Sequence, residues 1–273
     1  LLGLPFDIHT GGIDHREIHH PNEIAQNQAR CGSDHSGARF WMHNNFLIER
    51  SGKMSKSSGE FLRVQLLIDK GFHPLAYRLM CLQAHYRSEL EFSWEGLQAA
   101  LVRLKRMVMA VSNLKTRHAE LVSASIVPHK PMVEADTWTL KQVQGDVAPA
   151  ISATLKDFAT AVEDDLNTAV AITSLETLIG LKKVDVAQHL AAIAEMDAVL
   201  GLNLMTLTRQ DLRVRPKAAV ITEAEIETAL LLRKDARAEK DFAKSDAIRD
   251  DLIAKGVEVM DGDPLGWDWK LDI

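Results

Sequence analysis

The chain has 273 residues, of which 46% are hydrophobic and 26% are charged, a balance typical of ordinary folded proteins and not of disordered or fibrous ones. This length exceeds that of one usual domain, so we expect two or three compact units. A net charge of -6 argues against a surface that binds nucleic acid all over, because phosphate binding needs clustered Lys and Arg. A local basic face remains compatible with that charge.

Cysteine content and hydropathy indicate the compartment. Two cysteines, Cys31 and Cys81, are too few for a disulfide framework and fit a reducing environment. The sequence has no run of about 18 apolar residues and no charged-then-apolar leader, so we expect a soluble, cytoplasmic protein. The chain also opens without an initiator methionine, and Phe6-Asp7-Ile8 is typical of the end of a buried strand, so we expect further sequence upstream.

Residues 1–60 have the pattern of an α/β layer. A strand-like run, Phe40–Leu47, lies between a glycine turn at Gly11-Gly12 and a second loop at Ser51–Gly59. Because functional residues concentrate on loops that a rigid layer holds in place, we expect the chemistry of this region on those two loops.

Residues 61–115 change to a helical pattern. Apolar residues recur there at helical spacing, while basic residues occupy another face. The apolar positions are Leu97, Leu101, Leu104, Val108 and Val111, and the basic positions are Arg103, Lys105 and Arg106. Residues 116–150 lose this period and gather three prolines and a glycine among polar residues, so we predict a loop or an insertion there.

The pattern of residues 151–210 predicts a helical bundle, whose helices run to about Gly201. Residues 202–220 are predicted to be a linker. Its apolar face is predicted to contain Phe158, Val162, Leu166, Val170, Leu175 and Leu178. In the tail, residues 221–273, Thr222 and Glu225 predict a capping box, and two helices follow to about Lys255, where Gly256 ends them. Val257–Met260 and Trp267–Leu271 predict a short hairpin.

The first candidate site is the basic loop Lys53-Met54-Ser55-Lys56-Ser57. Two ammonium groups and backbone N–H donors on such a loop can bind a polyphosphate, and ATP is the natural ligand. Taken alone, the spacing of Lys53 and Lys56 is also compatible with a solvated basic loop that binds no phosphate.

The second candidate site is His19 with Glu23, since imidazole and carboxylate are both good zinc ligands. Pro21 is tolerated in the first turn of a helix, so a helix starting there would leave His19 just outside and Glu23 inside. The alternative is that His15, His19 and His20 are ordinary surface or core histidines.

A third candidate is the turn formed by Gly11, Gly12 and Asp14. Missing side chains let a ligand approach the backbone, and a carboxylate can accept hydrogen bonds from ribose hydroxyls. We therefore assign these three residues to the surroundings of a nucleotide.

The tail offers a possible RNA-binding surface. Arg233, Arg237, Lys240 and Lys244 fall on one stripe of a helical run, with Leu232, Ala236, Ala243 and Ala247 predicted to face inward. The alternative is a solvated face paired with Asp235, Glu239 and Asp241. Trp267 and Trp269 alternate in the hairpin, where one could stack on an unpaired base and the other is expected in the core.

These segments together resemble the cysteinyl-tRNA synthetases. That family carries an F-D-I-H-G-G-G-x-D…H-H-E-N-E-I-A-Q segment, similar to Asp7–Asp14 and His19–Glu23, upstream of a Lys-Met-Ser-Lys-Ser loop identical to Lys53–Ser57. Asp164-Asp165-Leu166-Asn167-Thr168 resembles a motif of its helical bundle, and Arg233–Leu252 resembles its carboxy-terminal tRNA-binding helices.

The resemblance implies a mainly α fold with an α/β start. Residues 1–60 would end a class I Rossmann-type catalytic domain, 61–115 would be stem-contact-like helices, and 151–210 a DALR-like bundle. Residues 221–273 would form a small α+β domain that binds the tRNA anticodon. The implied function is ATP-dependent attachment of L-cysteine to tRNA(Cys) through a cysteinyl-adenylate, by a monomeric enzyme that uses Mg²⁺ with ATP.

The resemblance also implies residue roles. Lys53 and Lys56 would act on the ATP phosphates, and His19 and Glu23 would bind one Zn²⁺ together with two cysteines outside this chain. The open zinc position would take the substrate thiolate. Zinc binds the soft sulfur of a thiolate well and a serine hydroxyl poorly, so the site would distinguish cysteine from serine. The family's first signature, a His-Ile-Gly-His-like segment, is absent, so we expect the isolated chain to be inactive.

Two alternatives to this function stay open. One is the related cysteine ligase of mycothiol biosynthesis, which does not use tRNA and lacks a tail like residues 222–273. The other is a non-catalytic tRNA-binding fragment.

Overall fold

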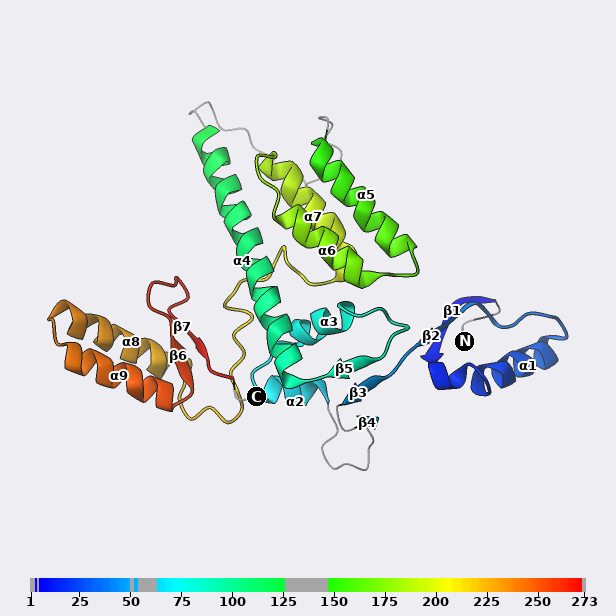
Figure 1. Ribbon diagram of the computed structural model, residues 1–273, viewed down its shortest axis with the longest axis horizontal. Coiled ribbons are helices and arrows are strands. Elements are labelled where there is room, and N and C mark those ends of the chain that lie inside the picture. Colours follow the sequence, from blue (N-terminus) through cyan, green and yellow to red (C-terminus); the bar gives the residue numbers. More distant parts are fainter. Residues whose placement is uncertain (1–2, 4, 50–51, 54–62, 126–146, 272–273) are drawn as a thin grey trace.

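The computed structural model describes residues 3, 5–49, 52–53, 63–125 and 147–271. Figure 1 shows an elongated arrangement, with a small βα unit at one end and a helical hairpin at the other. Between them the long helix α4 (Trp94–Ser125) rises toward a group of three helices. The described residues are mainly helical with three small sheets, as the sequence predicted.

The amino-terminal unit is a strand–helix–strand motif. Strand β1 (Phe6–Gly12) and strand β2 (Ala38–Asn44) pair in parallel, and helix α1 (His19–Cys31) makes the crossover between them. A short 3₁₀ helix, η1 (Ile13–His15), joins β1 to α1. The predicted strand-like run therefore begins two residues earlier, at Ala38, and a break after Asn44 separates it from β3 (Leu47–Glu49).

A three-stranded sheet follows, in the order β4-β3-β5. Strand β4 (Gly52–Lys53) runs antiparallel to β3, and β5 (Leu90–Phe92) runs parallel to it on the other side. Helices α2 (Val64–Asp69) and α3 (Pro74–Leu82) connect β4 to β5. Proline fits the first position of α3 because the N–H that it lacks has no partner inside the helix there.

Helix α4 links two hydrophobic cores. Near its start, Leu97 and Leu101 pack with Phe72 and Phe92, and further along Leu104, Val108 and Val111 pack into the core of the bundle. All five of its predicted core positions are buried. The helix continues to Ser125, so the first ten residues predicted as loop, 116–125, are helical. Positions 126–146 of that prediction lie outside the described residues.

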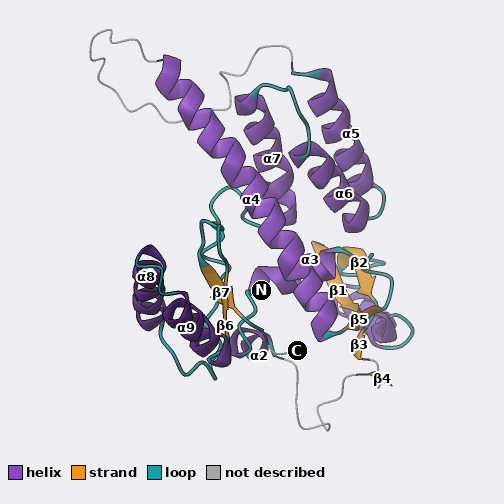
Figure 2. Cartoon of the chain, turned by 60° about the vertical axis from the view of Figure 1, so that its left-hand side comes forward, coloured by secondary structure: helices purple, strands orange, loops and turns teal. Residues whose placement is uncertain are grey.

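The bundle consists of α4 with α5 (Pro149–Glu163), α6 (Thr168–Ile179) and α7 (Val186–Leu200). Figures 1 and 2 show α5, α6 and α7 grouped beside the upper part of α4. Of the predicted bundle face, Phe158, Leu175 and Leu178 are buried, whereas Leu166 and Val170 are 45% and 49% exposed. The prediction fails at these two residues because Leu166 lies in the turn between α5 and α6, where the helical period is interrupted.

The carboxy-terminal unit packs two helices against a hairpin. Helix α8 (Glu223–Ala238), helix α9 (Phe242–Ala254) and strands β6 (Val257–Val259) and β7 (Trp267–Trp269) share one core. The predicted capping box is present: Glu225 N–H donates to the Thr222 hydroxyl oxygen, and Thr222 N–H donates to the Glu225 carboxylate. The predicted helix end at Gly256 and the antiparallel hairpin are also confirmed.

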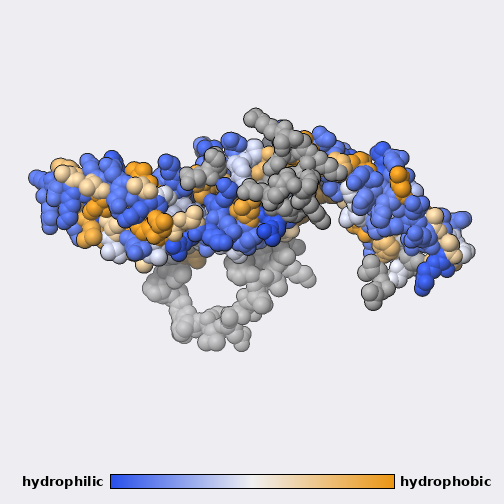
Figure 3. Space-filling view, turned by 90° about the horizontal axis from the view of Figure 1, so that it is seen from below, coloured by the Kyte–Doolittle hydropathy of each residue, from blue (hydrophilic) through white to orange (hydrophobic). Residues whose placement is uncertain are grey.

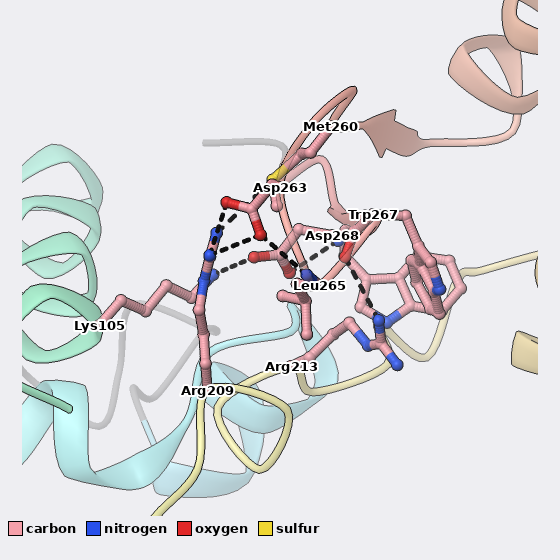
Figure 4. A network of polar contacts seen from close by, with 9 residues as sticks. Lys105, Arg209, Arg213, Met260, Asp263, Leu265, Trp267 and Asp268 are labelled. Carbon is pink, nitrogen blue, oxygen red and sulfur yellow. Dashed lines mark hydrogen bonds and ion pairs between the residues drawn. The ribbon is translucent and has the colours of Figure 1, made fainter. Parts of the chain in front are cut away.

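Ion pairs join this unit to the rest of the chain, and Figure 4 shows those of Lys105 and Arg209. The ammonium of Lys105, on α4, pairs with the carboxylate of Asp268, in the middle of β7. Arg209, in the segment before α8, donates from Nη1 to both oxygens of Asp263, at 2.8 and 2.6 Å. Because Asp268 is only 7% exposed, its charge depends on Lys105 for compensation.

Figure 3 shows one face of the molecule, on which hydrophilic residues predominate. Within the described ranges, no helix combines the length and the apolar character needed to cross a lipid bilayer.

Candidate functional site: a histidine cluster between β1, β2 and α1

Aromatic and imidazole rings gather on one side of the β1–β2 pair. His9 lies opposite Trp41 in the strand register, and Gly11 lies opposite His43. Since alternate residues of a strand face the same side, these four positions share one face. His20 of α1 packs onto it, with ring centroids 4.7 Å from His9 and 4.9 Å from Trp41.

Gly11 provides the space for His20. A methyl group at Gly11 would lie 2.6 Å from Cε1 of His20 and 2.9 Å from Nδ1 of His15, closer than side-chain carbons approach. Gly11 and Gly12 end strand β1 and do not form the predicted turn, because the chain turns in η1, at residues 13–15. The close approach that requires Gly11 is therefore that of His20, and Asp14 is exposed at the surface of the turn.

Glu23 connects two histidines. One carboxylate oxygen lies 3.1 Å from Nε2 of His9, and the other lies 3.0 Å from Nε2 of His19. His19 and Glu23 are one helical turn apart on α1, which begins at His19 and not at Pro21. The predicted helix start was wrong by two residues, because Pro21 occupies a later position of the first turn, which proline also tolerates.

The side chain of His20 is buried beside two other histidines. It is 2% exposed, its Nδ1 lies 2.8 Å from Nε2 of His43, and its Nε2 has no hydrogen-bond partner among the described residues. Burial lowers the pKa of His20, and the neighbouring His9 and His43 lower it further, against an opposing effect of Glu23. A neutral imidazole with a free ring nitrogen is the form that binds a metal ion.

His9, His20 and Glu23 form a set of potential metal ligands. One ligand atom of each lies within 4.8 Å of the other two, a spacing that small side-chain movements adapt to a common ion. Sequence reasoning identified Glu23 and His19 but missed His9 and His20. The sequence did contain a pattern that could have indicated His9: His9 and Gly11 are two residues apart on one predicted strand, as are Trp41 and His43 on another, so each pair faces one side of its strand.

The basic loop is described only at its start. Lys53 lies in β4, opposite Ile48 of β3, and Lys56 lies outside the described residues. The structure therefore gives the strand that leads into the loop and not the loop itself.

The predicted basic stripe of the tail is wrong. Arg233 is 6% exposed and donates from Nη1 and Nη2 to Asp261, at 2.6 and 2.8 Å, so it serves the core of the unit. Leu232, predicted inward, is 51% exposed. A turn at Lys240, with φ +63°, separates α8 from α9, so the four basic residues do not share one helix.

The predicted stacking surface of the hairpin is also absent. Trp267 and Trp269 are 2% and 4% exposed, and they contact each other edge to face at 5.1 Å. Arg213 covers the ring of Trp267, with its guanidinium 3.6 Å from the centroid (Figure 4). Both tryptophans therefore belong to the core, and neither presents a free face to a nucleic-acid base.

The chain is similar to known proteins both in one segment of its sequence and in its fold. Residues 1–102 match the family described as tRNA synthetases class I (C) catalytic domain. A solved ternary complex of Agrobacterium radiobacter K84 agnB2 LeuRS with tRNA and LeuAMS has a similar fold, with a TM-score of 0.50 at 16% identity, over 72% of this chain and 26% of that one.

The particular relatives are cysteine–tRNA ligases. That of Novosphingobium aromaticivorans is 65% identical over 99% of this chain and 52% of its own length. Those of Zymomonas mobilis and Treponema denticola are 49% and 36% identical, over 98% and 95% of this chain and 54% and 51% of theirs. The resemblance to the cysteinyl-tRNA synthetase family is thereby confirmed. The chain spans about half the length of the curated relatives that it matches.

Proposed function

We propose that this chain is part of a cysteine–tRNA ligase, which uses ATP to attach L-cysteine to tRNA(Cys) through a cysteinyl-adenylate. The observation that carries the proposal is the 65% identity with a cysteine–tRNA ligase along 99% of the chain. Because that match includes the tail, it favours a tRNA ligase over the tRNA-independent cysteine ligase. It equally favours an enzyme over a tRNA-binding fragment, because it includes the Lys53–Ser57 loop.

The ATP side of the proposed reaction involves the basic loop. Lys53 and Lys56 would neutralise the triphosphate, with Mg²⁺, as the carboxylate of cysteine attacks the α-phosphate and pyrophosphate leaves. Asp14, with Gly11 and Gly12 beside it, would lie close to the nucleotide. The enzyme would act as a monomer, and we expect this chain alone to form no adenylate.

The amino-acid side involves Zn²⁺. Glu23 and His19 are the proposed ligands. Two more imidazoles, those of His9 and His20, lie close to the Glu23 carboxylate, and Nε2 of His20 is buried with no partner among the described residues. This donor set of nitrogen and oxygen atoms fits zinc. When bound, the zinc would hold the substrate as a thiolate. The residues of this chain would hold the ligands in orientation, with Gly11 leaving room for His20.

Metal analysis of purified variants tests the zinc proposal. Glu23→Gln removes the carboxylate that both flanking histidines contact, so we expect bound zinc to fall at least tenfold in equilibrium dialysis. His19→Ala and His20→Ala, compared side by side, identify which imidazole is the ligand. His35→Ala, on an exposed loop, is the matched control. If Glu23→Gln bound as much zinc as the wild-type protein, this cluster would not be the zinc site.

The activity is tested by ATP–pyrophosphate exchange with the full-length protein that contains this chain. Exchange is expected with L-cysteine and not with L-serine, because zinc favours a thiolate over a hydroxyl. Lys56→Ala should lower the exchange rate by about a hundredfold or more, as loss of a group that stabilises transition-state charge does. Exchange that is equal with serine, or independent of any amino acid, would contradict the proposal.

A further inference from the structure

The turn between α5 and α6 has an unusual backbone. Asp165 and Leu166 are consecutive non-glycine residues with φ of +51° and +57°. The left-handed conformation costs an L-residue on the order of 1–2 kcal/mol, so two in succession persist only where surrounding contacts impose them. These residues belong to the Asp164–Thr168 motif, which neither the zinc nor the ATP site explains.

Backbone hydrogen bonds within the turn hold its conformation, from Leu166 N–H to the carbonyl of Val162 and from Asn167 N–H to the carbonyl of Ala161. The side chain of Asp165 is thereby directed to a distant segment of the chain. The carboxylate of Asp165 accepts hydrogen bonds from the Tyr86 hydroxyl, at 2.6 Å, and from Nε and Nη2 of Arg87. Nε2 of His85 lies 3.8 Å from the same carboxylate. The hydrogen bonds from Arg87 and Tyr86 lower the pKa of Asp165, so the carboxylate is charged near neutral pH.

Tyr86 and Arg87 also contact the residues that enter β3. The backbone N–H of Asn45 donates to the carbonyl of Tyr86 at 2.8 Å, and its side-chain amide donates to the carbonyl of Arg87 at 3.0 Å. Just beyond, Leu90 N–H donates to the carbonyl of Phe46 at 3.0 Å, which starts the parallel pairing of β5 with β3.

The chain of contacts ends at the basic loop. Strand β3 pairs on its other side with β4, where Ile48 lies opposite Lys53. Asp165 is therefore connected to the first lysine of the loop through the Tyr86–Arg87 segment and strand β3. The link joins the helical bundle to the ATP side of the catalytic domain.

We propose that Asp165 is a positioning residue for the adenylation reaction: by holding Tyr86 and Arg87, it fixes strand β3 and, through β4, the origin of the Lys53–Ser57 loop. The predicted effect of Asp165 on catalysis rests on the proposed function. The predicted effect of Asp165 on strand β3 rests on the geometry alone. Asp165 is far along the chain from that loop.

Hydrogen exchange of this chain measures the positioning directly. Asp165→Asn removes the charge but keeps a residue type that tolerates the left-handed conformation, so the turn should fold. We expect faster amide exchange in peptides covering residues 44–49 and 88–93, with the bundle peptide 168–179 unchanged. Asp164→Asn, at the exposed neighbouring position, is the matched control and should leave all three peptides unchanged. Unchanged exchange over 44–49 in Asp165→Asn would overturn the inference.

Kinetics of the full-length protein measure the consequence. In cysteine-dependent ATP–pyrophosphate exchange, Asp165→Asn should lower kcat about tenfold or more, since a displacement of about 1 Å of a reacting group can cost a hundredfold. The KM for cysteine should stay unchanged, and Arg87→Gln should cause the same loss, with no additional loss in the double variant. A merely structural turn would lower the amount of folded protein and leave the kcat of the folded fraction intact.

The two proposals fail in different ways. If the wild-type protein shows no cysteine-dependent exchange, the proposed function fails, and hydrogen exchange still decides the role of Asp165 in holding β3. If the wild-type protein is active and Asp165→Asn equals Asp164→Asn in kcat, the positioning role is wrong while the function stands.

Discussion

A single glycine, Gly11, determines where the histidine cluster forms. Gly11 allows His20 to pack against His9 and Trp41, and this burial leaves Nε2 of His20 without a hydrogen-bond partner in the part of the chain that the structure describes. The proposed binding of a metal at Glu23 would thus depend on a residue that offers no ligand. It also depends on the parallel register of two strands that are 25 residues or more apart in sequence.

Gly11→Ala tests this dependence. The added methyl group overlaps the rings of His20 and His15, so we expect a loss of about 1–3 kcal/mol in the free energy of unfolding, together with weaker zinc binding. Chemical denaturation measures the first effect. Gly180→Ala is the control: a methyl group there has no contact closer than 3.4 Å, and its φ of -78° suits any residue. Equal stabilities of the two variants would contradict the account.

At this scale the sequence predicted what local spacing encodes. His19 and Glu23 are separated by one helical turn, so their contact followed from the sequence once a helix was assumed. His9 and His20 were missed, because their approach depends on the pairing of β1 with β2 and on the packing of α1 across it, and neither is local. The side chain of Lys53 and the whole of Lys56 lie outside what the structure describes.

The elements of the carboxy-terminal unit depend on a buried cation. Arg233 projects from α8 into the unit and is neutralised by Asp261, in the loop between β6 and β7. The capping box, the helix end at Gly256 and the hairpin were predictable from a few adjacent residues each. The inward side of α8 was not, because it depends on the pairing of Arg233 with Asp261, 28 residues further along the chain. Likewise α4 extends to Ser125 although its apolar period fades earlier.

Asp261→Asn tests the role of this pair through its pH dependence. Hydrogen bonds from Arg233 lower the pKa of Asp261 below its usual value of 3.8, so the unfolded chain binds the proton more readily. The stabilisation is therefore complete above about pH 5 and is lost as the pH falls through the lowered pKa. We expect wild type to melt above Asp261→Asn at pH 7, with the difference shrinking toward pH 3. A difference in Tm that stays constant over this range would show that the charge is not the cause.

Polar contacts between residues far apart in sequence join the units of the molecule. Lys105 and Asp268 are 163 residues apart in sequence and meet where the carboxy-terminal unit lies beside α4 (Figures 2 and 4). No local pattern predicts such a contact, since both residues lie in otherwise ordinary helix and strand positions. The mutual placement of the units therefore did not follow from the sequence.

Lys105→Met tests this junction. It leaves the buried carboxylate of Asp268 without a counter-charge, so we expect a loss of about 3 kcal/mol in the free energy of unfolding. The double variant Lys105→Met/Asp268→Asn should recover part of it. Lys255→Met, which breaks an exposed pair with Asp251, is the control and should cost less than about 0.5 kcal/mol. Similar losses in both single variants would mean that the junction adds nothing beyond an ordinary surface pair.

The central claim, that this chain is part of a cysteine–tRNA ligase, is tested most directly by charging of tRNA(Cys). Full-length protein containing this chain would be incubated with ATP, radiolabelled cysteine and tRNA(Cys), with tRNA(Ser) and serine as parallel controls. The account predicts cysteine attached to tRNA(Cys) alone, with loss of the product in Lys56→Ala. Binding of tRNA(Cys) without any attached cysteine, at saturating ATP and zinc, would contradict it.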